Sequence, residues 1–136
     1  MNDIIINKLK KMTMKALKRN EVPIGCVIVK NDKIIAKAYN KKISTKDPMA
    51  HAEILAIKRA CKKIGSWNLK ECVLYVTLRP CKMCECVINE SRIKKVNYII
   101  DNNKIVNNNM IITKINNQIL EKEYQTILSN FFKNKR

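Results

Sequence analysis

A seven-residue apolar run, Cys72–Leu78 (CVLYVTL), is the feature that most constrains the fold of this chain. A strand with one face in water alternates apolar and polar residues, whereas a strand buried on both faces is apolar nearly throughout. The run therefore predicts a buried strand. The chain has 136 residues, which falls in the size range of one domain, about 100–200 residues. We expect a single domain over residues 1–136.

Segments with helical and strand periodicity alternate around this run. In the first segment the apolar residues Ile5, Leu9, Met12 and Ala16 recur at steps of three and four, which predicts an amphipathic helix. Pro48 predicts the start of a later helix at residue 49, because proline is favoured just inside a helix start. The predicted helices are 3–20, 49–64, 81–89 and 119–132, and the other predicted strands are 24–30, 34–39, 95–100 and 110–114.

The order of these segments indicates an α/β fold. The strands 24–30 and 34–39 are separated by a short polar turn and predict a hairpin. Strands and helices then alternate to the end of the chain. This order predicts a mixed five-stranded sheet covered by helices on both faces.

The net charge of +17, from 28 Lys and Arg against 11 Asp and Glu, has two interpretations. One is a polyanionic partner, namely a nucleic acid. The other is compositional drift, since Lys, Ile and Asn are abundant throughout. Only five of the 28 cations are arginine, the residue that phosphate forks prefer. Charge alone leaves both open.

Six cysteines without a secretory signal indicate a reduced compartment, so we expect a cytoplasmic protein with no disulfide framework. Cys26, Cys61 and Cys72 lie in apolar stretches and are expected to be core residues. No apolar run approaches the roughly 18 residues that span a bilayer, so we expect no membrane partner.

Two short fragments carry the chemistry: His51-Ala52-Glu53 and Pro80-Cys81-Lys82-Met83-Cys84. A lone CxxC is often a redox motif or a chance pair, but here it combines with the only histidine of the chain. One imidazole and two thiolates are zinc ligands, and three protein ligands leave a position open for water. We therefore expect one Zn²⁺ per chain. Glu53, close to the histidine, would be the proton acceptor.

Cys86 is the remaining cysteine near this motif. At about 100° per residue, Cys81 and Cys84 lie roughly 60° apart around a helix, while Cys86 faces another direction. A closed site with three cysteines is therefore disfavoured.

These fragments resemble the signature of the zinc-dependent cytidine/deoxycytidylate deaminase superfamily, H-x-E followed by P-C-x-x-C. The finer resemblance is to the family of bacterial tRNA-specific adenosine deaminases, which make inosine at the wobble position. The stretches that carry it are EVPIGCVIV (21–29), AYN (38–40), DPMAHAEILA (47–56), LYVTLRPCKMC (74–84), SRIKKV (91–96) and LSNFFKNKR (128–136).

The resemblance implies a cytidine-deaminase-like three-layer fold and a homodimer that binds the anticodon stem-loop of tRNA. It also implies that His51, Cys81 and Cys84 hold the zinc. Glu53 would shuttle a proton from the zinc-activated water to the adenine ring and the leaving amine.

The resemblance assigns three further residues to the substrate. Asn40 would hydrogen-bond the flipped nucleoside, and Val22 and Ile24 would wall the base pocket. The ending of the chain suggests an RNA contact as well, because Phe131 and Phe132 precede several cations, among them Lys133 and Arg136. The alternative for this ending is that both rings anchor the helix and the tail is solvated.

Two departures from the family stand out. Arg79 occupies the position before Pro-Cys where the family usually has Glu. This change is without effect on function, adds a phosphate contact, or marks a different substrate. The segment 101–109 is rich in Asn where the family has Gly and small residues, which puts RNA contacts there in doubt.

We expect hydrolytic deamination of adenosine to inosine in tRNA. The alternative enzyme is a zinc deaminase of a free nucleobase or nucleoside, of the guanine or cytosine type. A third interpretation is a non-catalytic RNA-binding subunit, which would be expected to lack Glu53.

Overall fold

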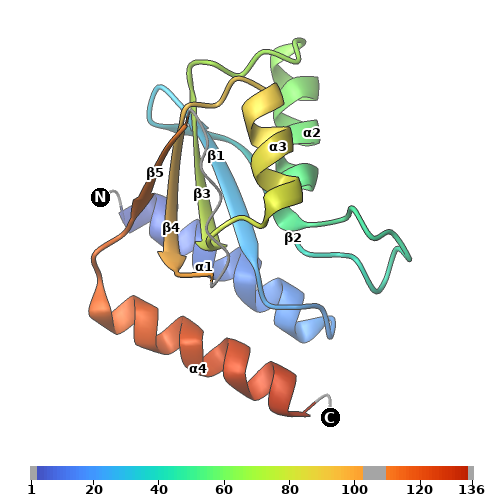
Figure 1. The fold of residues 1–136 in the computed structure, drawn as a ribbon, viewed down its shortest axis with the longest axis vertical. Helices are drawn as coiled ribbons and strands as arrows, with labels where there is room; N and C mark the ends of the chain where they lie inside the picture. The colour runs from blue at the N-terminus through green and yellow to red at the C-terminus, as the bar shows by residue number, and fades with distance from the viewer. Residues whose placement is uncertain (1–2, 103–109, 135–136) are drawn as a thin grey trace.

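The computed structural model describes residues 3–102 and 110–134 and contains every predicted helix and strand (Figure 1). The elements are α1 (Asp3–Lys18), β1 (Gly25–Lys30), β2 (Lys33–Tyr39), α2 (Ala52–Ile64), β3 (Cys72–Leu78), α3 (Lys82–Glu90), β4 (Lys95–Ile100), β5 (Ile111–Lys114) and α4 (Gln118–Asn134). None of the described helices is long and apolar enough to cross a membrane.

The five strands form one sheet in the order β2-β1-β3-β4-β5. β1 pairs antiparallel with both β2 and β3, whereas β3, β4 and β5 are parallel to one another. The apolar run of β3 therefore lies in the middle of the sheet. The predicted mixed five-stranded sheet is confirmed.

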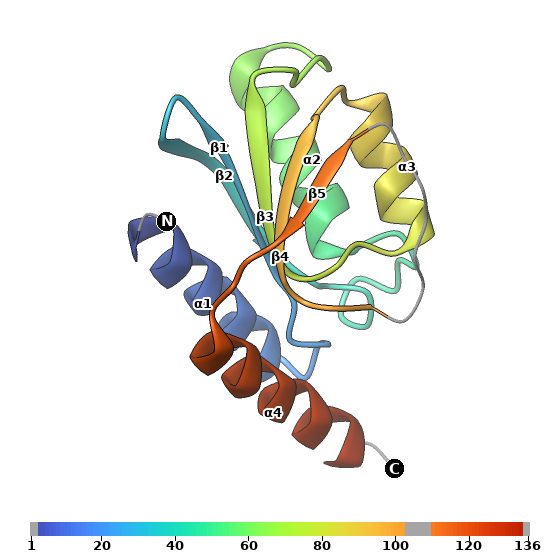
Figure 2. The same cartoon turned by 60° about the vertical axis from the view of Figure 1, so that its left-hand side comes forward.

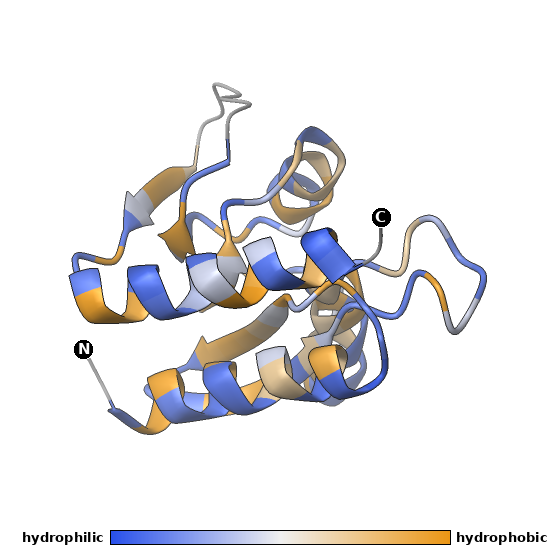
Figure 3. Ribbon diagram, turned by 90° about the horizontal axis from the view of Figure 1, so that it is seen from below, coloured by the Kyte–Doolittle hydropathy of each residue, from blue (hydrophilic) through white to orange (hydrophobic). Residues whose placement is uncertain are grey.

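Helices cover both faces of this sheet, with α2 and α3 on one side and α1 and α4 on the other (Figures 1 and 2). β1 is apolar at every position but the last because both of its faces are buried. Cys26 and Ile28 belong to the core cluster beneath α2, while Val27 and Val29 belong to the cluster beneath α1 and α4. The second face is covered by two amphipathic helices, along which hydrophilic and hydrophobic residues alternate (Figure 3). These two helices are tied together by the ion pair of Lys10 with Glu123, at 2.6 Å.

The three cysteines expected in the core lie on the α2 side of the sheet. Cys26 and Cys72 are buried in that cluster, and Cys61 packs against it.

α1 approaches the sheet closely at Gly25, the first residue of β1. A Cβ at this position would lie 2.8 Å from Met12 Cβ, 2.8 Å from the Thr13 nitrogen and 2.9 Å from the Leu9 oxygen. Two of these three atoms are backbone, so the helix itself would have to move. The glycine in this β-branched run is thus required by helix–sheet contact.

Gly25→Ala is expected to lower the free energy of unfolding by about 1–3 kcal/mol, the usual cost of overpacking a filled core. Urea denaturation measures this directly. Gly65→Asn is the matched control: nothing lies within 4 Å of a Cβ there, and its φ of 79° is one that asparagine tolerates. Equal stability of Gly25→Ala and the wild type would show that α1 is not held tightly on β1.

Two predicted helix boundaries are wrong near the motif residues. α2 begins at Ala52 rather than at residue 49. Asp47 explains the difference, because its carboxylate accepts the Met49 N–H at 2.9 Å and its carbonyl accepts the Ala50 N–H at 3.1 Å. These bonds form a separate turn after which the chain extends once more before the helix. α3 likewise begins at Lys82, one residue after Cys81.

Candidate active site

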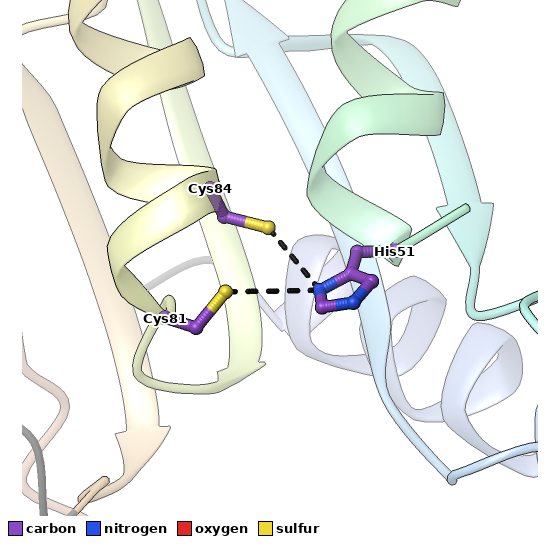
Figure 4. Close-up of side chains that lie close together, drawn as sticks. All are labelled: His51, Cys81 and Cys84. Atoms are coloured by element: carbon purple, nitrogen blue, oxygen red, sulfur yellow. Dashed lines mark hydrogen bonds between the residues drawn. The ribbon is translucent and has the colours of Figure 1, made fainter. Parts of the chain in front are cut away.

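The N-termini of α2 and α3 bring the two motif fragments together (Figure 4). His51 is the N-cap of α2 and Cys81 is the N-cap of α3, both with extended backbone (ψ 150° and 172°). Neither side chain caps its own helix. The imidazole and the thiol are therefore available to a ligand between the helices.

The three predicted metal-binding side chains point toward one another. His51 Nδ1 lies 3.4 Å from Cys84 Sγ and 3.8 Å from Cys81 Sγ, and all three donor atoms lie within 4.8 Å of one another. With Zn–N near 2.1 Å and Zn–S near 2.3 Å, a tetrahedral site has N···S edges of about 3.6 Å. The donor set fits a zinc ion. Cys86 is exposed and outside this group.

The two sulfurs and the imidazole shift one another's pKa values. Hydrogen bonding from Cys84, and then from His51, holds the pKa of the Cys81 thiol far below its usual value. Hydrogen bonding with Cys81 raises the pKa of Cys84, which keeps its proton, and also raises the pKa of His51. Metal ions bind thiolates and neutral imidazole, so a bound cation would displace protons from this group.

Glu53 lies in the first turn of α2, two residues after His51, and only 4% of it is exposed. Burial raises the pKa of its carboxyl from 4.5 to about 7. A carboxyl with a pKa near neutrality can both accept and return a proton at physiological pH, which is the property of an acid–base catalyst.

The predicted substrate residues lie just before β1 begins and just after β2 ends. Asn40 is 5% exposed, and its backbone N–H donates to the Ile24 carbonyl at 3.1 Å. Its side-chain amide has no hydrogen-bond partner among the described residues, so it is available to a ligand. Val22 and Ile24 are half-buried but pack on opposite sides, Val22 with the α1 and α4 cluster and Ile24 with the α2 cluster.

The C-terminal aromatic residues have different environments. Phe131 is buried with 8% exposed, whereas Phe132 is 53% exposed, and the two rings meet edge to face at 5.4 Å. Lys133 is exposed beside Phe132. Arg136 lies outside the described residues.

Arg79 points into the protein and is balanced there by a buried acid. Its Nε lies 4.0 Å from Glu85 Oε1, and its guanidinium lies 5.5 Å from the centre of the Tyr98 ring. Glu85 is fully buried in α3. This arrangement favours a structural ion pair over a phosphate contact. Glu85 is not predicted as a functional residue by the motifs; its only signal in the sequence is an acidic residue on the buried face of a short helix.

Comparisons with known proteins agree with this geometry. A family described as MafB19-like deaminase matches residues 1–136. A tRNA-specific adenosine deaminase of Buchnera aphidicola (subsp. Schizaphis graminum) is 40% identical over 131 residues, covering 89% of this chain and 87% of that protein. One of Aquifex aeolicus is 51% identical over 82 residues, covering 60% of this chain and 54% of that protein. The chain thus matches just over half the length of some curated relatives.

Two solved structures that are 36% identical to this chain share its fold. One, from a study of A-to-I editing by tRNA deaminases at the wobble position of transfer RNA, is 36% identical with a TM-score of 0.71, covering 74% of this chain and 77% of that chain. The other, guanine deaminase from Bacillus subtilis, is 36% identical with a TM-score of 0.69, covering 74% of this chain and 66% of that chain. The cytidine-deaminase-like fold predicted from the motifs is confirmed.

Proposed function

The chain belongs to the MafB19-like deaminase family, and from this premise we propose that it converts adenosine to inosine at the wobble position of tRNA. The observation that carries the proposal is a buried carboxyl, Glu53, two residues after His51 of the His51–Cys81–Cys84 group. The relatives named above supply the substrate class. A non-catalytic subunit is disfavoured because the carboxyl is retained.

The metal we propose is zinc, one ion per chain, held by His51, Cys81 and Cys84. When bound, zinc would supply a Lewis acid that lowers the pKa of water toward 7. The donor atoms favour this assignment, since two sulfurs and one imidazole nitrogen suit zinc better than Mg²⁺ or Ca²⁺.

Glu53 would move the protons of the reaction. It would accept a proton as water adds to C6 of adenine and would deliver that proton to the ring nitrogen N1. Glu53 would then take the proton of the new C6 hydroxyl and pass it to the amino group, so that the C6=O bond forms as the C6–N6 bond breaks and ammonia departs. The carboxyl ends in its starting state, so a single group with a pKa near 7 suffices.

Asn40 would orient the nucleoside through its unpaired side-chain amide, and Ile24, on the α2 side of the sheet, would bound the base pocket. Val22 packs on the opposite side of the sheet, so we do not place it in this pocket. The base must leave its stack to reach a site between two helix N-termini. In an anticodon loop the free-energy cost of unstacking is small, because its bases are already single-stranded.

The same chemistry could serve a free base, and the guanine deaminase similarity supports that alternative. The test is to incubate the purified protein with an anticodon stem-loop that carries adenosine at the wobble position and to sequence for inosine. Parallel reactions use guanine, cytosine and free adenosine. We expect inosine in the stem-loop alone. Release of ammonia from guanine with an unmodified stem-loop would overturn the tRNA assignment in favour of the alternative.

Three further parts of the proposal follow from the family resemblance and the substrate. The domain spans residues 1–136, the protein acts as a homodimer, and it works in the cytoplasm, where tRNA is available. Sedimentation of the purified protein, alone and with the stem-loop, measures the oligomeric state.

Phe132 and Lys133 are the described residues of α4 that we propose to contact RNA. Phe132→Ala is expected to weaken stem-loop binding by about 1–3 kcal/mol, the usual worth of one base–aromatic stack. Phe131→Ala is the contrasting variant, because the buried ring contributes to packing and its loss should lower stability first. Unchanged binding by Phe132→Ala would show that the exposed ring only covers its neighbour.

A further inference from the structure

Glu21 is a fully buried acidic residue that the proposed chemistry does not use. Its Oε1 accepts the backbone N–H of Ile43 at 3.0 Å, and its Oε2 accepts that of Ser44 at 2.7 Å. Both oxygens thus hold the same short segment, the lysine loop (residues 41–47), which lies more than 20 positions away in sequence.

The lysine loop joins two predicted site residues, Asn40 and His51, through the turn at 48–50. Its base is closed by the Lys41 N–H, which donates to the Ala50 carbonyl at 2.9 Å. The carboxylate of Glu21 binds near the middle of the loop, away from this base. The position of the loop relative to the site therefore depends on two attachments, and only one of them is local in sequence.

The side chains of the lysine loop are mostly exposed. Residues 42–46 are all exposed, including the apolar side chain of Ile43 at 57%. Apart from those to Glu21, the hydrogen bonds that residues 42–46 make with the described part of the chain stay within the loop, such as the Thr45 hydroxyl donating to the Lys41 carbonyl at 2.6 Å. An exposed loop with few buried apolar contacts is expected to open at low free-energy cost. The buried carboxylate of Glu21 opposes this opening, because the carboxylate would lose two charge-assisted hydrogen bonds if the loop moved away.

The loop also concentrates positive charge at the edge of the site. It contains Lys41, Lys42 and Lys46, of which Lys42 and Lys46 are exposed. Lysines on a fixed backbone beside the target base can meet the phosphates of the flanking nucleotides.

We propose that Glu21 is a positioning residue for RNA binding: it holds the lysine loop beside the active site so that Lys42 and Lys46 contact phosphates next to the target adenosine. This inference rests on the proposed tRNA function for its ligand, whereas the hold of Glu21 on the loop is a property of the protein alone. The two parts can be tested separately.

The first test measures the loop without RNA. Glu21→Gln keeps the size of the side chain but replaces one acceptor oxygen by an amide that cannot accept a hydrogen bond. Amide hydrogen exchange of the zinc-loaded protein should show Ile43 and Ser44 exchanging about 10–100-fold faster, the equivalent of one hydrogen bond to a charged group. Glu123→Gln, on the surface of α4, should leave these amides unchanged. Equal exchange in Glu21→Gln and the wild type would overturn the proposal.

The second test measures RNA binding. Glu21→Gln should raise KM for the stem-loop about 10-fold while kcat and zinc content stay near wild type, because the loop does not touch the reacting atoms. Lys42→Gln/Lys46→Gln should raise KM similarly and flatten the dependence of binding on salt by about 0.7 in slope per lost phosphate contact. These lysines are exposed, so this variant remains informative if Glu21→Gln folds poorly.

Combining the three substitutions decides whether the effects share one cause. If Glu21 acts through the lysines, the triple variant should bind little worse than the double variant, since interacting residues are non-additive. Additive losses, or an unchanged KM in the lysine variant, would overturn the proposal. A wild-type protein that leaves the stem-loop unmodified would contradict the proposed function instead, and the exchange result would still stand.

Discussion

Glu53→Gln is expected to lower kcat for stem-loop deamination by at least about 10²–10⁴-fold, the usual contribution of general acid–base catalysis. The amide keeps the shape of the side chain but cannot accept the proton from water or return it to N1. Because the group is 4% exposed and lies between two helix N-termini, bulk water has poor access to replace it. Single-turnover kinetics with sequencing for inosine measures the loss.

The same variant should retain zinc and bind the stem-loop with near wild-type affinity, since the carboxyl is not among the metal-binding side chains. Glu123→Gln is the control for removal of a carboxylate elsewhere; that side chain pairs with Lys10 on the surface and should leave kcat unchanged. Turnover of Glu53→Gln within a few-fold of the wild type would mean that another base acts in this site.

Cys81→Ala is expected to reduce bound zinc from about one ion per chain to a small fraction and to abolish turnover. Loss of a residue that only orients a ligand costs about 10–100-fold in metal affinity, so loss of a ligand itself should cost more. Cys81 is also the thiol whose pKa is already lowered, mainly by hydrogen bonding from Cys84.

Cys86→Ala provides the matched control for this experiment. It removes a thiol from the same helix, only two positions beyond Cys84, but one that is exposed and outside the donor group. Metal analysis of both variants after dialysis should show full zinc in Cys86→Ala and little in Cys81→Ala. The reverse pattern, or undiminished zinc in Cys81→Ala, would refute the assignment of ligands.

Arg79 and Glu85 illustrate what long-range contacts decide. The sequence left open whether Arg79 is neutral, contacts phosphate or marks another substrate. Its neighbours are Glu85 in α3 and Tyr98 in β4, and no local periodicity predicts that these two elements meet its side chain. Each side chain compensates the charge of the other. Removing one of them alone would leave a buried charge unpaired, whereas removing both would not.

Periodicity and motif spacing by themselves determined the elements, the mixed sheet and the identity of the chemical groups. The near-continuous apolar runs of β1 and β3 consist of consecutive residues, so a local pattern suffices to predict them. The pairing of one histidine with a CxxC likewise follows from residue type, because few other side chains bind a soft metal.

Only the tertiary structure decided the positions of these groups relative to one another. It moved the start of α2 to Ala52, because the side chain and carbonyl of Asp47 close a turn before the helix begins. It placed Gly25 against α1 and Glu21 beneath the lysine loop. These contacts join residues distant in sequence, and their free energies depend on packing and desolvation that exist only once the sheet and helices have assembled.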